Sequence, residues 1–164
     1  MKRVRHLGVL ALAIAAGHAI AHDEHHKVDA KTIRVEAKGH GAALGQPGDP
    51  AKVSRTIEVD MSDRMRFIPD HIEVKRGETI RFVVRNSGKV KHEMVLGTTS
   101  ELKAHAALMR KFPEMEHADP NQVAVESGRT GEMLWRFTQS GRFDFACLQP
   151  GHFESGMVGK VAVK

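Results

Sequence analysis

Short segments in which apolar and polar residues alternate follow one another from residue 53 to residue 164, and Gly, Pro, Asn or Ser separates them. Such alternation puts one face of a strand in a core and the other in solvent. The segments are VSRTIEVDM, HIEV, TIRFVVRN, NQVAVES, EMLWRFT, RFDFACL and MVGKVAVK. Short strands at this regular spacing predict an antiparallel β-sandwich. We expect its core to contain the large side chains of Val83, Trp135, Phe137, Phe143, Phe145 and Val161.

A different pattern interrupts the strands between about residues 100 and 120. Ser100 is suited to cap a helix, and Pro113 would end one. Apolar residues lie between them at helical spacing: Leu102, Ala106, Met109 and Phe112. The sequence therefore predicts one short helical insertion in an all-β domain.

Residues 1–21 have the pattern of a secretory signal peptide. Lys2, Arg3 and Arg5 precede the apolar run LGVLALAIAA, and the tripeptide AIA ending at Ala21 suits cleavage. The apolar run is shorter than the roughly 18 residues that a membrane span needs, and no later segment approaches that length. An uncut membrane anchor is the alternative. We expect export, cleavage after Ala21 and no membrane span.

Cleavage there would lower the formal net charge from +5 to +2, leaving 22 basic residues against 20 acidic ones. The remaining chain has no run of Lys and Arg interleaved with aromatic residues. Such a run is the pattern expected of a nucleic-acid surface. We therefore expect no nucleic-acid partner.

Residues 22–52 are polar, rich in Gly, Ala, Lys and His, and without sustained apolar periodicity. This composition predicts a flexible N-terminal arm. His22, His25 and His26 lie close together in the segment HDEHH. A short histidine-rich tract can bind an additional, weaker copper ion, and the alternative is a solvated polar tail.

Cys147 is the only cysteine of the chain, so an internal disulfide cannot form. His152 and Met157 follow it within the run FACLQPGHFESGM. A thiolate, an imidazole and a thioether together suit a copper ion that cycles between two oxidation states. A buried, inert cysteine is the alternative interpretation.

A fourth ligand must come from another strand end, because a rigid metal site needs support from more than one loop. His92 has the right setting, since it follows a strand and a turn and precedes the apolar run MVLG. His71 lies at the head of a strand, and His105 and His117 belong to the helical insertion, so these three fit less well.

The segments RFIPDHIEVKRGETIRFVVRNSGKVKHEMVLG and TGEMLWRFTQSGRFDFACLQPGHFESGMVGKVAVK resemble the cupredoxin family, of the plastocyanin, azurin and auracyanin kind. The resemblance covers roughly residues 53–164 apart from the insertion, and is strongest to small periplasmic cupredoxins of bacterial copper tolerance. It implies a Greek-key β-sandwich with one type 1 copper. The family pattern would put His92, Cys147 and His152 in the trigonal plane and Met157 in the weak axial position.

The resemblance also implies a function: a periplasmic one-electron carrier linked to copper tolerance. We expect a monomer. We do not expect an enzyme such as a copper oxidase using His22, because the segment HDEHHK offers no additional fixed ligands for a catalytic copper. A redox partner would dock near His152, with Pro150 and Phe153 as possible neighbours. The alternative is a protein that sequesters or shuttles copper with this site and its His- and Met-rich segments. Glu93 stands where plastocyanin and azurin have asparagine, so the bond by which that asparagine joins the two ligand loops is not predicted. Whether the site is blue or green also stays open.

Overall fold

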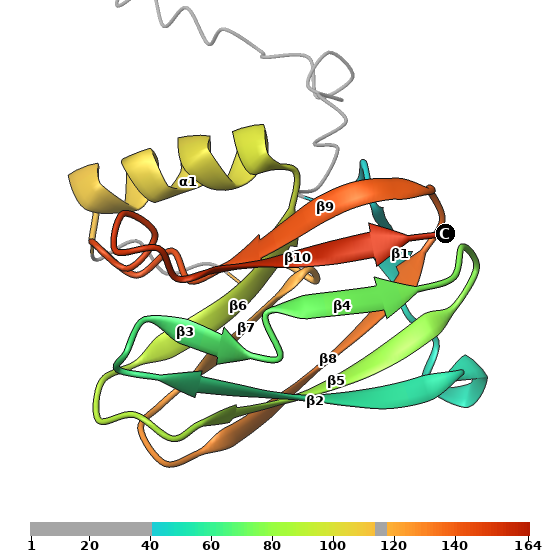
Figure 1. Ribbon diagram of the computed structural model, residues 1–164, viewed down its shortest axis with the longest axis horizontal. Coiled ribbons are helices and arrows are strands. Elements are labelled where there is room, and N and C mark those ends of the chain that lie inside the picture. Colours follow the sequence, from blue (N-terminus) through green and yellow to red (C-terminus); the bar gives the residue numbers. More distant parts are fainter. Residues whose placement is uncertain (1–40, 114–117) are drawn as a thin grey trace, which may run out of the picture. The chain divides into compact units, whose positions relative to one another are not determined.

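Ten strands form two five-stranded sheets in the computed structural model, which describes residues 41–113 and 118–164 (Figure 1). The first sheet has the order β1 (Gly45–Pro47), β8 (Thr130–Phe137), β5 (Thr79–Asn86), β2 (Arg55–Ser62), β3 (Arg66–Ile68). The second has the order β4 (His71–Val74), β10 (Val158–Val163), β9 (Gly141–Ala146), β6 (His92–Gly97), β7 (Gln122–Val125). The predicted Greek-key β-sandwich with one helical insertion is confirmed. The proposed signal peptide and the histidines of the HDEHH tract lie outside the described residues.

Both sheets are mixed, whereas the sequence predicted an antiparallel sandwich. β2 runs parallel to β5, and β4 runs parallel to β10. The chain leaves the first sheet after β3, forms β4 in the second sheet and returns as β5. Alternation along a single strand shows which face is buried, but it does not show which strand lies alongside.

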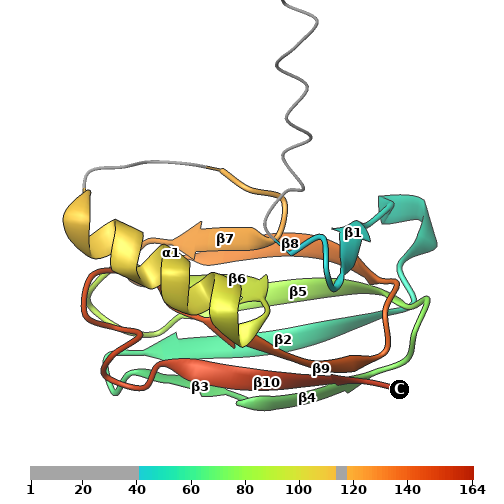
Figure 2. The same cartoon turned by 90° about the horizontal axis from the view of Figure 1, so that it is seen from above.

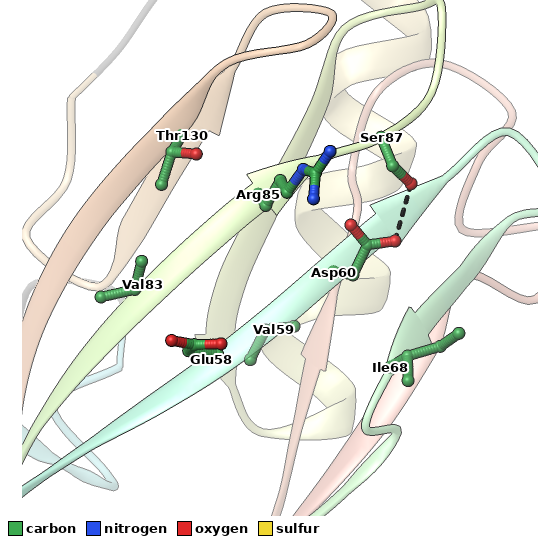
Figure 3. A pocket seen from close by; sticks show the side chains of 8 residues that line it. All are labelled: Glu58, Val59, Asp60, Ile68, Val83, Arg85, Ser87 and Thr130. Carbon is green, nitrogen blue, oxygen red and sulfur yellow. Dashed lines mark hydrogen bonds between the residues drawn. The ribbon is translucent and has the colours of Figure 1, made fainter.

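Aliphatic and aromatic side chains together fill the core of the sandwich. Phe67 and Phe145 meet edge to face with ring centroids 4.9 Å apart, an arrangement that aromatic pairs favour. Five of the six predicted core residues are buried, and Val83 is not. Val83 lies between Phe82 and Val84, which are both fully buried, so the period of two turns it to the outer face. There it lines a shallow hollow with Glu58, Asp60 and Arg85 (Figure 3).

The predicted helix is α1 (Thr99–Lys111), and its N-cap is Thr98 rather than Ser100. Thr98 and Glu101 form a reciprocal capping box, which satisfies two backbone N–H groups at the helix start. The helix lies along β6 and β9 (Figure 2). Its apolar side packs on the second sheet in a cluster of buried residues: Val95, Leu102, Ala106, Met109, Ala146 and Leu148. In the described part of the chain, no helix has the length and apolar character to cross a membrane.

The structure differs from the predicted arm at residues 41–52. Leu44 is fully buried, β1 pairs with β8, and a short 3₁₀ helix spans Pro50–Lys52. A Cβ atom at Gly45 would lie 1.9 Å from the Arg136 carbonyl oxygen, so the close approach of β1 requires glycine. Leu44 is the one large apolar residue in this segment rich in Gly and Ala, and it gives no periodic signal, which is why the sequence did not predict this strand.

Three connections gather at one end of the sandwich, on the left in Figure 1. They are the turn from β2 to β3, the loop from β5 to β6, and the loop from β9 to β10. His92 is the first residue of β6, Cys147 directly follows β9, and Met157 directly precedes β10. The sandwich therefore brings the predicted ligand residues to one end.

Candidate metal centre

Cys147 lies between two imidazole rings. Its Sγ atom is 3.2 Å from Nδ1 of His152 and 3.8 Å from Nδ1 of His92. The centroids of the two rings are 4.8 Å apart, and the rings are tilted by 49°. Ligand atoms held about 2.0–2.3 Å from one ion lie no more than about 4.6 Å apart. Both distances from the thiol fit a single ion.

The loop from Cys147 to Met157 is closed by its own backbone. The Cys147 N–H donates to the Met157 carbonyl oxygen, and the Met157 N–H donates to the His152 carbonyl oxygen, each over 3.1 Å. Met157 is fully buried in the same apolar cluster as Cys147. These bonds place the predicted axial residue beside the thiol-bearing strand end.

The other candidate histidines lie apart from this centre or outside the description. His71 is exposed and contacts Asp70, with 2.9 Å between Nδ1 and Oδ1. His105 is buried in α1, and His117 is not among the described residues. Within residues 41–113 and 118–164, the one cluster of three or more His, Cys, Asp or Glu side chains with metal-ligand spacing is His92, Cys147 and His152.

The burial of Cys147 means that its thiolate form would need a cation beside it. Burial raises the pKa of its thiol to about 12, although the backbone N–H groups of Glu93 and Gln149 partly offset this rise. Burial and then the neighbouring His92 lower the pKa of His152, which favours the neutral imidazole that binds metals. A metal ion would supply the positive charge that a buried thiolate needs. One thiol and two imidazoles, with a thioether nearby, fit copper.

Glu93 joins the two ligand loops. Its carboxylate Oε1 accepts a hydrogen bond from the Leu148 N–H over 3.1 Å, and its own N–H points to the Cys147 Sγ atom at 3.4 Å. Glu93 is buried, with 4% of its surface exposed. A bond between the loops, which the resemblance did not predict for glutamate, is therefore made by its longer side chain.

Replacing Glu93 with alanine is expected to lower the free energy of unfolding of the copper-free protein by about 1–3 kcal/mol, because the Leu148 N–H loses its partner in a buried place. Glu93→Gln removes the charge but retains an acceptor oxygen, so it should lose less. Urea unfolding followed by circular dichroism measures both variants. Equal midpoints for the wild type and Glu93→Ala would show that the bond does not stabilise the fold.

Asp63, in the turn between β2 and β3, is a member of the site that the sequence did not predict. Its Oδ1 atom lies 3.1 Å from Nε2 of His92. The backbone N–H of Lys89 and then the His92 side chain lower the pKa of this carboxyl group. An aspartate in a turn is common, and nothing in the local pattern distinguishes this one.

The fold and this centre define a class of protein that binds copper in a β-sandwich. Residues 53–164 match the family described as copper binding proteins of the plastocyanin/azurin family, and the chain belongs to that family. The cupredoxin resemblance is thereby confirmed.

Two relatives are each named copper-resistant cuproprotein CopI. The protein from Rubrivivax gelatinosus is 54% identical over 147 residues, covering 90% of this chain and 83% of the relative. The protein from Pseudomonas aeruginosa is 38% identical over 154 residues, covering 76% of this chain and 84% of the relative. Among solved structures, auracyanin B aligns with a TM-score of 0.61 at 21% identity, over 74% of this chain and 96% of auracyanin B. The similarity to auracyanin B shows the fold alone.

Proposed function

We propose that this protein is a periplasmic type 1 copper protein that transfers single electrons in a role linked to copper tolerance. The observation that carries the proposal is the position of the only cysteine, whose buried Sγ atom lies between the Nδ1 atoms of His92 and His152. In the proposed centre these three residues are the strong ligands and Met157 is the weak axial ligand. The name that the two relatives share supports the link to copper tolerance.

Bound copper would supply the one-electron couple between Cu(I) and Cu(II). The protein's part is to hold the ligands in one arrangement. His92 belongs to β6, and Cys147 is fixed by its backbone bond to Met157 and by the Glu93 link to the next residue. A ligand set fixed in this way rearranges little when the charge of the ion changes, which favours fast electron transfer. Four protein donors leave no open position for a substrate, so we propose a carrier rather than an enzyme.

The two histidines differ in their access to solvent. His92 is fully buried, whereas His152 is only partly buried and belongs to the surface loop between β9 and β10. We therefore propose that a redox partner docks over His152, beside Pro150 and Phe153. The weaker copper site at His22, His25 and His26 stays a prediction.

Reconstitution with copper, followed by visible absorption and electron paramagnetic resonance, tests the proposed centre. An intense thiolate-to-copper band is expected, and its absence would contradict the proposal. A second experiment separates electron transfer from copper shuttling: the oxidised, loaded protein is mixed with a reduced c-type cytochrome in the presence of a Cu(I) chelator. In a carrier the band disappears on reduction, returns when an added one-electron oxidant such as ferricyanide reoxidises the copper, and the copper stays bound through repeated cycles. A shuttle loses copper to the chelator after the first reduction.

Copper should also stabilise the fold. A ligand present at 100 times its Kd that binds only the folded state raises the free energy of unfolding by about 2.7 kcal/mol. For a domain of this size, that gain corresponds to a rise of roughly 10 °C in Tm. Scanning calorimetry of chelator-treated and copper-loaded protein measures the shift. If Cys147→Ser shows the same shift, copper stabilises the protein from a different site.

A further inference from the structure

We propose that Asp63 is a positioning residue of the metal centre, which holds His92 by its Nε2–H group so that Nδ1 remains the ligand atom, and whose negative charge favours Cu(II) over Cu(I). This inference rests on the proposed function. It concerns a residue outside the set of four predicted ligands, in a different turn of the sandwich.

The two nitrogens of the buried His92 ring face different partners. Nδ1 lies 3.8 Å from the Cys147 Sγ atom, and Nε2 lies 3.1 Å from Oδ1 of Asp63. An ionised carboxylate only accepts hydrogen bonds, so Nε2 must carry the proton and donate it to Asp63. The neutral ring then has its lone pair on Nδ1, on the side of Cys147 and His152.

Asp63 is itself fixed by the loop that leads to His92. Its Oδ2 atom accepts from the Lys89 N–H over 2.8 Å, and its Oδ1 atom lies 3.4 Å from the Val90 N–H. A Cβ atom at Gly88 would lie 2.1 Å from Oδ1, so the loop can pass this close to the carboxylate only with glycine at that position. The turn between β2 and β3 and the loop before β6 therefore fit together around Asp63.

This loop has further anchors that keep it in register with the carboxylate. Asn86, which is fully buried, donates from Nδ2 to the carbonyl oxygens of Val90 and Val125. Ser127 donates from Oγ to the Gly88 carbonyl oxygen. The loop is held from both sides, and its N–H groups in turn hold the Asp63 carboxylate. Because the carboxylate is fixed in place, it can fix the orientation of the His92 ring.

A carboxylate behind a metal-bound histidine makes the ring a stronger donor. Stronger donation stabilises the more highly charged ion, so Asp63 should lower the reduction potential of the centre. Losing such a partner typically costs about 10- to 100-fold in metal affinity. If Asp63→Asn weakens Cu(II) binding tenfold more than Cu(I) binding, the potential rises by about 59 mV.

The test compares Asp63→Asn with Asp60→Asn as a matched control. Asp60 is a carboxylate in the neighbouring strand β2 that accepts from the Ser87 hydroxyl over 2.7 Å, and its replacement changes the net charge equally (Figure 3). Cu(II) affinity is measured by competition with a chelator, and the potential by redox titration. We expect Asp63→Asn alone to weaken Cu(II) binding at least tenfold and to raise the potential. Equal values for both variants would overturn the proposal.

A second measurement needs no variant. Long-range ¹H–¹⁵N NMR of the copper-free wild type shows which nitrogen of His92 carries the proton. A proton on Nε2 supports the assignment, and an Nε2 without a proton overturns it. Either result is distinct from failure of the proposed function, which would appear as a wild type without a thiolate-to-copper band.

Discussion

Replacing Cys147 with serine is expected to abolish the intense thiolate-to-copper absorption band and to weaken copper binding by more than about 100-fold. Loss of a residue that only supports a ligand already costs about 10- to 100-fold in affinity, and Cys147 is the proposed anionic ligand itself. A serine hydroxyl is a harder, neutral donor that copper binds poorly beside imidazole. Visible absorption during copper titration and competition with a chelator measure the two effects.

Met157→Leu is the matched control for this variant. It replaces a second fully buried side chain of the same loop by an apolar one of similar size, and so preserves the packing. The thioether is proposed to be the weak axial ligand, so Met157→Leu should keep the thiolate band and shift the potential. Circular dichroism of both copper-free variants checks that they fold. A thiolate-type band that survives in Cys147→Ser would remove Cys147 from the centre.

The sequence predicted much of this centre because its residues carry a strong local signal. Cys147, His152 and Met157 occur in one short run, and a lone cysteine in such a run is informative. His92 was chosen by its setting after a strand and a turn, and the structure brings its ring to the thiol. The assignment of copper to these four side chains remains a proposal, tested by the variants above.

Contacts between residues that are distant in the sequence could not be predicted from local sequence patterns. Asp63 and His92 come together because β2 and β5 lie side by side in parallel, so the turn after one meets the loop after the other. Nothing near Asp63 in the sequence indicates that pairing. Glu93 was judged by what asparagine does in other family members, whereas its longer side chain reaches the Leu148 N–H.

The start of the domain shows the same limit at the level of the fold. Periodicity begins at Val53, but the folded part already includes Leu44, which is fully buried. The Leu44 carbonyl oxygen accepts a hydrogen bond over 3.0 Å from the N–H of Thr138, the residue that directly follows β8. Shortly after β1, the Gly48 N–H donates to the Leu134 carbonyl oxygen over 2.9 Å.

A chain that begins at Val53 is therefore expected to have a free energy of unfolding at least about 3 kcal/mol lower than a chain that begins at residue 41. The reason is that truncation of a single buried leucine already lowers this free energy by about 2.7–5.0 kcal/mol in well-packed cores. Loss of β1 (Gly45–Pro47) also leaves the edge of β8 without its partner, which favours aggregation. Urea unfolding of the two chains, with a chain that begins at residue 22 as control, measures the difference. Equal stability would show that β1 and Leu44 contribute nothing. Any test of the histidine tract in copper tolerance should accordingly remove residues 22–40 alone, since a deletion to Lys52 would confound loss of the histidines with loss of the fold.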